Sequence, residues 1–469
     1  MKKIKKGLAL ICVALLAISM LTGCNKGAND VEVFKMWTDS ANEREIEQVA
    51  KFNETIGKEN GIKLELTNYG SDYAKTIEMA IANDNAPDFF KAQGALSAQV
   101  EKGNLMPVSD LPGMEELLGQ YEHMFAEGAN KIGDDVYSIP GRRVLTGLIY
   151  NKDMFKAAGI VDENGEAKYP RTFAEVTEYA KRLTNTDKNE YGFIFPLKWG
   201  GFWGTEITST VATYSGRGNF DYDADKYDFS NYRPIMEWVL EMKESGSLFP
   251  GSDSMENDAA RAQFAAGRVG MKMAASWDVY VLNDQFPAEC EWGVCPIPKF
   301  NIDDPDYYHY SYTEALMNVS SSVIKKGRDL EKVALILKWY YSDDRIGEMY
   351  QYADMIPAKS DIADNYEVLV DKQGQADFGE IAKLADKPTA PAWVKIKYEG
   401  EAVNTVWDKV WSGHLTLDKA IEQLNRDYNA AYEVAKQEND MEQYYKLLPM
   451  PSNKIPSEVV ENSKFLGGK

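Results

Sequence analysis

Histidine is scarce in this chain. Only three of its 469 residues are histidines, and they lie far apart in the sequence. None of them has the short spacing to cysteine, histidine or an acidic residue that zinc sites show, and a histidine-based catalytic triad has few candidates. The sequence therefore predicts no metal centre and no hydrolase of the triad type. The three are His123, His309 and His414.

Cysteine is almost as rare, with four residues, two of which lie close to the N-terminus. The other two, Cys290 and Cys295, flank the segment EWGV. If that segment is extended, five steps of about 3.3 Å separate the two residues by about 16 Å. A disulfide needs Cα atoms within roughly 7 Å. We therefore expect two buried thiols rather than a disulfide.

Positive charge is also in deficit. Lysine and arginine number 52 against 73 aspartates and glutamates, which gives a formal charge of −21. Such a surface repels nucleic acid and anionic lipid headgroups, so binding to either through a basic patch is excluded as a main role. With 44% apolar and 27% charged residues, the composition is that of an ordinary soluble globular protein.

The longest apolar run lies at the N-terminus. Four lysines precede an apolar or small-residue run from Gly7 to Met20, the layout of an export signal. The run is too short to span roughly 30 Å of hydrocarbon. It ends in LTGC, which resembles the bacterial lipobox, whose cysteine is diacylated and becomes the new N-terminus. We expect a signal peptide over residues 1–23, a lipid on Cys24 and a leash over 24–31, since two acyl chains anchor a protein stably. The alternative is an ordinary signal peptide with an incidental cysteine.

Strands and helices alternate after this segment. VEVFKMW (31–37), IKLELTNY (62–69) and APDFFKA (86–92) read as strands, and helical periods occupy about 38–54 and 73–84. Alternation of this kind predicts an α/β fold with parallel strands. The roughly 446 residues left after a signal peptide exceed what one core usually organises, so two lobes are expected.

The order of these segments resembles the extracellular solute-binding proteins of family 1, the carbohydrate-binding subunits of ABC importers. The resemblance covers essentially the whole mature chain, and is carried by NAPDFF, KGNLMPVSDL, DDVYSIPGRRVLTGLIYNKDMFKAAGI, YPRTFAEVTEYAKRLT, FAAGRVGMKMAASWDV, EWGVCPIPKF, YADMIPAKSDI and GHLTLDKAIEQLNRDYNAAYEVA. It implies a two-lobed, type II periplasmic-binding-protein-like fold, with the ligand cleft between lobes that a multi-segment hinge joins. It further implies a monomer without enzyme activity or cofactor. Its partners would be a carbohydrate ligand and the transmembrane permease subunits.

Two chain crossings between the lobes are expected, near 142–147 and 314–318. Lobe 1 would then contain residues 32–142 and about 278–318, and lobe 2 residues 143–277 and about 319–469. In YPRTFAEV, Thr172 is placed to cap a helix, with Glu175 three residues later.

Sugar sites combine aromatic platforms with planar hydrogen-bonding side chains. Trp37, Thr38 and Asp39 follow the first strand directly, at the edge where open α/β sheets bind ligands, and Gln93 follows the third strand. We expect these four to contact the ligand. Alternatively, Asp39 or Ser40 caps the next helix.

The second lobe offers two candidate segments. LKWGGFWGTE contains Trp199, Trp203 and Glu206 among glycines that let the backbone approach a ring, although its tryptophans could instead cover a hydrophobic core. MKMAASWDVY presents Trp277 and Asp278 after an apolar strand. The family resemblance implies that Trp277 stacks on the sugar.

The expected crossings supply the remaining candidates. Arg142 and Arg143 could bind an acidic group on a sugar bidentately, or at least one of them could simply be solvated. Further candidates at the second crossing and before the segment IPAK are Tyr312, Glu314, Tyr352 and Met355.

Specificity within the family is less well marked. Where maltodextrin binders carry an aromatic pair, this chain has Gly400 and Glu401, which argues against maltodextrin. NKDMFKAAGI and the chain length resemble the subgroup associated with plant-wall oligosaccharides. A calcium loop at TDKNEYG has Asp187 and Asn189 but lacks the later acidic ligands, so no metal is expected.

Two other functions remain open. One is the same fold binding a non-sugar solute, such as a polyamine, an iron chelate or a phosphorylated compound. The other is a secreted glycoside hydrolase, which needs two carboxyl groups about 5–10 Å apart. No nucleophile elbow or metal motif supports that second alternative.

Overall fold

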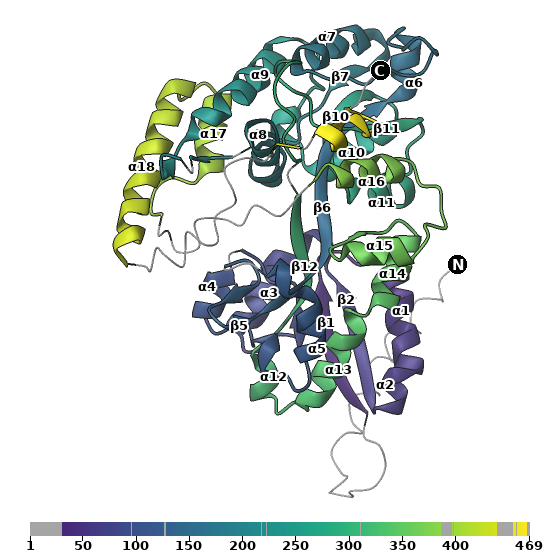
Figure 1. Cartoon of the computed structure of the whole chain (residues 1–469), viewed down its shortest axis with the longest axis vertical. Coiled ribbons are helices and arrows are strands. Elements are labelled where there is room, and N and C mark those ends of the chain that lie inside the picture. Colours follow the sequence, from purple (N-terminus) through teal and green to yellow (C-terminus); the bar gives the residue numbers. More distant parts are fainter. Residues whose placement is uncertain are drawn as a thin grey trace, which may run out of the picture.

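The computed structural model describes residues 31–94, 96–125, 128–216, 218–221, 223–309, 311–385, 396, 398–438, 454–455 and 457–466. The expected signal peptide, the lipidation site Cys24 and most of the leash lie outside these residues. Two groups of strands and helices stand at opposite ends of the molecule, and two long strands run between them (Figure 1). No helix in the described ranges combines the length and apolar character needed to cross a membrane.

Lobe 1 is built on the parallel strands β1 (Glu32–Thr38), β2 (Ile62–Asn68) and β3 (Phe89–Phe90). Their alternating burial follows from the alternating apolar residues of the sequence, with Phe34 and Met36 fully buried in β1. The helices of this lobe are α1 (Glu43–Glu54), α2 (Ile56–Glu59), α3 (Tyr73–Ala82), α4 (Leu96–Glu101), α5 (Glu115–Tyr121), α12 (Ser322–Lys325), α13 (Leu330–Tyr340), α14 (Asp343–Gln351) and α15 (Ser360–Asn365). A small hairpin joins β4 (Lys131–Ile132) to β5 (Asp135–Val136).

Lobe 2 contains the strands β7 (Tyr191–Phe193), β10 (Val269–Ala275) and β11 (Trp292–Cys295), and the hairpin of β8 (Phe220–Asp221) with β9 (Lys226–Tyr227). Its helices are α6 (Lys152–Ala157), α7 (Phe173–Leu183), α8 (Thr208–Ser215), α9 (Arg233–Glu244), α10 (Asn257–Ala265), α11 (Asp278–Tyr280), α16 (Gln375–Lys383), α17 (Val403–Trp411), α18 (Leu417–Glu438) and α20 (Ser457–Glu461). Two π-helical turns, η5 (Phe202–Ile207) and η8 (Val281–Gln285), precede α8 and follow α11.

One continuous sheet connects the lobes, in the order β2-β1-β3-β12-β6-β10-β7. Its long members are β6 (Ser138–Asn151) and β12 (Ser311–Val319), while β11 and β13 (Ile356–Pro357) also pair with β6. The partner of β6 changes along its length: Leu145 is paired with Ser311 of β12, and the next residue, Thr146, is paired with Ala275 of β10. We call this level the strand crossing. It falls within the segment 142–147, where the sequence placed the first passage between lobes.

The hydrophobic cores assign two segments differently from the sequence expectation. Residues of 319–362, including Leu337 and Ile346, share a core with Phe34 of β1 in lobe 1. Residues of 279–297, including Val294, share a core with Ile149 and Phe193 in lobe 2. The expectation had placed 278–318 in lobe 1 and 319–469 in lobe 2. The difference arises because β11 returns beside β6, so the chain remains in lobe 2 until β12 carries it back.

Predictions for single residues and short segments agree better with the structure than the predicted division into lobes does. Cys290 and Cys295 are buried free thiols, as expected. Thr172 forms a capping box with Glu175 at the start of α7, also as expected. Helix α1 is capped by Asn42, whose Oδ1 accepts a bond of 2.8 Å from the Glu45 amide, so neither Asp39 nor Ser40 is its cap.

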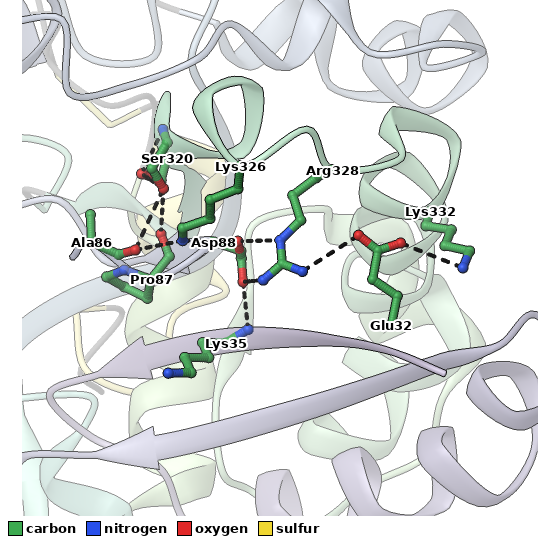
Figure 2. A network of polar contacts seen from close by, with 10 residues as sticks. Glu32, Lys35, Ala86, Pro87, Asp88, Ser320, Lys326, Arg328 and Lys332 are labelled. Carbon is green, nitrogen blue, oxygen red and sulfur yellow. Dashed lines mark hydrogen bonds and ion pairs between the residues drawn. The ribbon is translucent and has the colours of Figure 1, made fainter. Parts of the chain in front are cut away.

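A buried carboxylate ties together the elements of lobe 1. Asp88 is 0% exposed and precedes β3. Its oxygens accept hydrogen bonds from the Lys35 amide (2.8 Å), from Arg328 Nε (2.9 Å) and Nη2 (3.0 Å), and from Lys326 Nζ (3.1 Å). Figure 2 shows these donors converging on Asp88 from β1 and from the segment that follows α12. Asp88 therefore has a structural role in lobe 1.

His309 gives the fold a defined pH dependence. Its side chain is 4% exposed and its Nδ1 has no hydrogen-bond partner in the described structure. Burial lowers its pKa to about 4, with a smaller opposing effect of Asp306. The unfolded chain therefore takes up a proton near pH 6.5 that the folded chain does not, so stability should fall between about pH 6.5 and 4. This contribution amounts to about 3 kcal/mol.

The test compares the wild type with a His309→Phe variant in urea unfolding at several pH values. The variant should lose less free energy of unfolding than the wild type when the pH is lowered from 7 to 4. Equal losses would show that His309 does not carry this pH dependence.

Candidate functional site

Four charged side chains meet at the edge of lobe 1 that faces the strand crossing. Asp39 follows β1 and Lys91 follows β3, so both lie at the carboxyl ends of parallel strands, where open α/β sheets bind ligands. Lys91 Nζ is 3.2 Å from Asp39 Oδ2 and 2.8 Å from Glu314 Oε1. Glu314 in turn is paired with Arg142, with an Nη2 to Oε2 distance of 2.6 Å. We call Asp39, Lys91, Glu314 and Arg142 the ionic cluster.

The register of the crossing strands explains the centre of this cluster. Glu314 of β12 stands directly opposite Arg142 of β6. Burial alone would disfavour the charge on Glu314, but Arg142 and Lys91 outweigh it and hold the pKa of this carboxyl at about 2. The carboxylate is therefore ionised at any physiological pH, which makes it an acceptor of hydrogen bonds and not a proton donor.

Trp277 reaches the same crossing from lobe 2. It directly follows Ser276, whose amide donates to the Leu145 carbonyl (2.9 Å) and whose Oγ accepts from the Leu145 amide (3.3 Å). Leu145 is three residues from Arg142, about 10 Å along an extended strand. The Trp277 ring is half-buried and belongs to none of the three core clusters of the described residues. The turn that contains Trp277 thus lies at the strand crossing, on the opposite lobe from Asp39 and Lys91.

The other lobe 1 candidates surround the cluster. Trp37 contacts Tyr69 edge to face, with ring centroids 4.8 Å apart, and Thr38 is buried at the end of β1. Gln93 is half-buried, and its Nε2 donates to the Lys91 carbonyl at 3.4 Å. That same carbonyl accepts from the Tyr73 hydroxyl at 2.7 Å, which fixes the backbone of Lys91.

Three further candidates lie on or beside the crossing strands. Tyr312 is two residues from Glu314 and so faces the same side of β12. Arg143 donates to the Ala385 carbonyl (2.8 Å) and to Ser311 Oγ (3.4 Å), so it helps to hold the chain after α16. Met355 immediately precedes β13, which pairs with β6 at Arg143 and Arg142.

Tyr352 is placed by a cation at the end of α14. The Arg44 guanidinium lies 3.4 Å from its ring centroid and also pairs with Asp354 at 2.8 Å. Lys372 binds the other oxygen of Asp354 (2.9 Å) and reaches Asp284 in lobe 2 (2.7 Å). The chain near Tyr352 is therefore linked electrostatically to both lobes.

The segment LKWGGFWGTE belongs to the core of lobe 2 in this structure. Trp203 is 2% exposed and its Nε1 donates to Asp408 of α17 at 2.7 Å. Glu206 is 4% exposed and pairs with Lys272 at 3.0 Å, while Trp199 is half-buried against the same core. The expectation of an open ligand loop is corrected here, because the segment folds into the turn η5 and packs on α17.

Asp278 also has a structural environment rather than an open one. It is 1% exposed, and its Oδ1 and Oδ2 accept from Arg261 Nε (2.6 Å) and the Ala275 amide (2.9 Å). The sequence expectation of a ligand contact from Asp278 is therefore corrected. Its bonds fix the turn that presents Trp277, so it acts as a positioning residue.

Sequence reasoning did not include Lys91 among the site residues. The residue lies two positions before Gln93 and follows the same strand, so the rule that selected Gln93 would also have selected it. A lysine after a strand is usually solvated, whereas this one is held between two carboxylates and its side chain is only 18% exposed.

Cavities and metals do not add to this site. Two cavities of the described structure lie in lobe 2, one beside Tyr214 and Phe465 and the other beside Trp292, and no predicted ligand residue lines either of them. Within the described ranges, no three histidine, cysteine or acidic side chains gather as metal ligands would. The candidate site is therefore defined by side chains at the strand crossing.

Two α/β lobes, joined by strands that pass from one to the other, define the class of type II periplasmic-binding proteins. The chain belongs to the bacterial extracellular solute-binding protein family, whose model matches residues 41–344. Membership indicates a protein that binds solutes outside the cytoplasm, and it fits a transport protein rather than an enzyme.

Known proteins show the same likeness. The fructooligosaccharide ABC transporter substrate-binding protein FusA of Streptococcus pneumoniae is 22% identical over 235 residues, which cover 43% of this chain and 42% of that protein. The alignment thus spans less than half of that relative.

Solved structures share the fold over nearly their whole length. An ABC transporter solute-binding protein from Thermotoga lettingae, bound with α-D-tagatose, is 20% identical with a TM-score of 0.66, covering 85% of this chain and 99% of that one. A substrate-binding protein from Listeria monocytogenes in complex with cycloalternan is 18% identical with a TM-score of 0.62, covering 86% and 99%.

Proposed function

We propose that this protein is the substrate-binding component of an ABC importer, and that it captures a sugar or oligosaccharide and delivers it to the permease subunits. The observation that carries the proposal is that the turn containing Trp277 and the ionic cluster both lie at the strand crossing, on opposite lobes. An aromatic face suits the C–H surface of a sugar, and carboxylates with cations suit its hydroxyl groups. Relatives named for fructooligosaccharide, tagatose and cycloalternan add support.

The mechanism is closure of two lobes on the ligand. Trp277 belongs to lobe 2, and Asp39 and Lys91 belong to lobe 1, so a ligand that contacts both bridges the lobes. Such a ligand binds the closed form better than the open form and shifts the population towards it. The permease then binds the closed conformation, which forms when the ligand is bound. The protein acts as a monomer in this scheme.

The charge state of the site argues against the glycosidase alternative. A glycosidase needs one carboxyl group with a raised pKa as its acid. The pKa of Glu314 is lowered to about 2, which makes it unsuitable for that role. Burial raises the pKa of Glu206 to about 7, but this carboxyl is enclosed with Lys272 inside lobe 2.

The N-terminal segment completes the proposal. Cleavage before Cys24 and its diacylation would tether the protein to the outer face of the cell membrane, and residues 24–31 would join the lipid to β1. Expression with a palmitate label tests this step. A Cys24→Ser variant should lose the label and leave the membrane fraction, whereas label retained on the variant would contradict it.

Titration calorimetry tests the binding function itself. The probes are 1-kestose, maltotriose, xylotetraose and chitotriose, with spermidine as a cationic alternative; xylotetraose represents the plant-wall sugars suggested by the sequence. Saturable binding of at least one sugar is expected. If the folded protein binds spermidine and no sugar, the alternative of a non-sugar ligand is favoured over the proposal. Release of reducing sugar would favour the glycoside hydrolase alternative.

A further inference from the structure

Both cations of the ionic cluster are already paired with carboxylates. Arg142 contacts Glu314 Oε2 through Nη2 (2.6 Å) and Nε (2.7 Å). Lys91 is shared between Glu314 (2.8 Å) and Asp39 (3.2 Å). Two positive and two negative side chains therefore give the cluster no net charge.

The cluster is accessible but not fully solvated. The exposed fractions of its side chains are 18% for Lys91, 23% for both Arg142 and Glu314, and 32% for Asp39. Water screens charges less at such a position than on an open surface, so an added like charge is repelled more strongly. A carboxylate on a ligand would lie beside Glu314 and Asp39, with neither cation available to it.

An uncharged hydroxyl group meets no such barrier. It can donate a hydrogen bond to a carboxylate and accept one from lysine or arginine, and it does not alter the charge balance of the cluster. A site built from paired charges therefore suits polyhydroxylated ligands and disfavours ionised ones.

On this basis we propose that Glu314 is a specificity-determining residue, which makes the site select uncharged carbohydrates and reject carbohydrates that carry carboxylates. The inference rests on the proposed function. It argues against one role considered from the sequence, in which Arg142 binds an acidic sugar, because Glu314 occupies Arg142. The low pKa of Glu314, about 2, agrees with a carboxylate that stays charged.

The direct experiment compares neutral and acidic forms of the same sugars by titration calorimetry. The probes are 1-kestose and maltotriose, each unmodified and with its primary hydroxyls oxidised to carboxylates, and xylotetraose with and without a glucuronate side group. The wild type should bind the neutral member of a pair at least tenfold more tightly than the acidic member.

The variant Glu314→Gln keeps the shape of the side chain and removes its charge, leaving Arg142 and Lys91 able to pair with a ligand carboxylate. The ratio of neutral to acidic affinity should fall at least tenfold. Asp39→Asn removes one of the two carboxylates that contact Lys91 and leaves Arg142 paired, so it should lower the ratio by less. The matched control is Glu291→Gln, because Glu291 also contacts two lysines, Lys152 (3.1 Å) and Lys156 (3.7 Å), but at the far end of lobe 2. This control should keep the wild-type ratio.

The outcomes separate this inference from the proposed function. A wild type that binds the acidic member as tightly as the neutral one overturns the selectivity and leaves sugar binding intact. An unchanged ratio in folded Glu314→Gln assigns the selectivity to other residues and overturns the role of Glu314. Binding of no member of any pair counts against the proposed function itself. If Glu314→Gln does not fold, the ratio of neutral to acidic affinity in the wild type still tests the selectivity. The same ratio in Asp39→Asn still tests whether the carboxylates of the ionic cluster cause it.

Discussion

Replacing Trp277 with alanine should weaken carbohydrate binding about 30-fold or more, which corresponds to roughly 2 kcal/mol. The half-buried ring is the aromatic group that the turn after β10 presents at the strand crossing. Tryptophan offers a large apolar face with few rotatable bonds, so its truncation removes contact area that a smaller residue does not replace. Titration calorimetry with the sugar that binds the wild type most tightly measures the change.

Two controls make this prediction specific. Trp277→Phe keeps a ring and should recover most of the affinity. Trp339→Phe changes a tryptophan that packs on Phe52 in lobe 1, with ring centroids 4.4 Å apart, and it should bind sugar as the wild type does. Wild-type affinity in Trp277→Ala would show that the ring does not contact the ligand, and the proposed site would then have to be sought elsewhere.

Single elements of the fold follow closely from the sequence where their signals are local. The segment VEVFKMW alternates apolar and polar residues, and it forms β1 over Glu32–Thr38. The capping box at Thr172 is likewise a pattern of four neighbouring residues. The type of local structure in such short segments is indicated by their own residues, so a pattern is enough to predict it.

The distribution of the chain between lobes depends on pairing over long distances. Whether residues 319–366 join lobe 1 is decided by β12, which pairs with β3 and β6, and no local pattern reveals those partners. The burial of Trp203 has a similar cause, since its indole bonds to Asp408, 205 positions later. The glycines around it suggested an open loop, but a distant helix covers the segment.

The ionic cluster at the candidate site also depends on pairing between residues that are far apart in the sequence. Its members lie at positions 39, 91, 142 and 314, and each taken alone is as compatible with a solvated surface as with a ligand contact. Strand ends bring Asp39 and Lys91 together, and the register of β6 with β12 adds Arg142 and Glu314. The sequence indicated the region and most of its residues, whereas their pairing, and hence the neutral charge of the cluster, required the structure.

The second large effect is expected on stability, from Asp88→Asn. Asp88 is 0% exposed and accepts from Arg328 and Lys326, whose side chains are only 20% and 29% exposed. Loss of the negative charge removes the carboxylate that Lys326 and Arg328 share and leaves Arg328 with its longer contact to Glu32 (3.5 Å) (Figure 2). Breaking a buried ion pair from one side costs about 3 kcal/mol. The amide oxygen can still accept from the Lys35 amide, but the amide NH2 then faces the donors Arg328 Nε and Lys326 Nζ, which lose this acceptor.

Because two lobes can unfold separately, a single unfolding curve is not a sufficient measurement of this effect. Hydrogen exchange of the β1 and β3 amides reports on lobe 1, and exchange of the β10 amides reports on lobe 2. Protection should fall in β1 and β3 of Asp88→Asn and remain nearly unchanged in β10. Asp84→Asn is the matched control, since Asp84 pairs with Lys325 at 2.9 Å on the same lobe but is 81% exposed. Exposed ion pairs contribute about 0–1 kcal/mol, so amide protection in Asp84→Asn should stay close to that of the wild type. Equal protection in the two variants would show that Asp88 does not join β1 to the segment after α12.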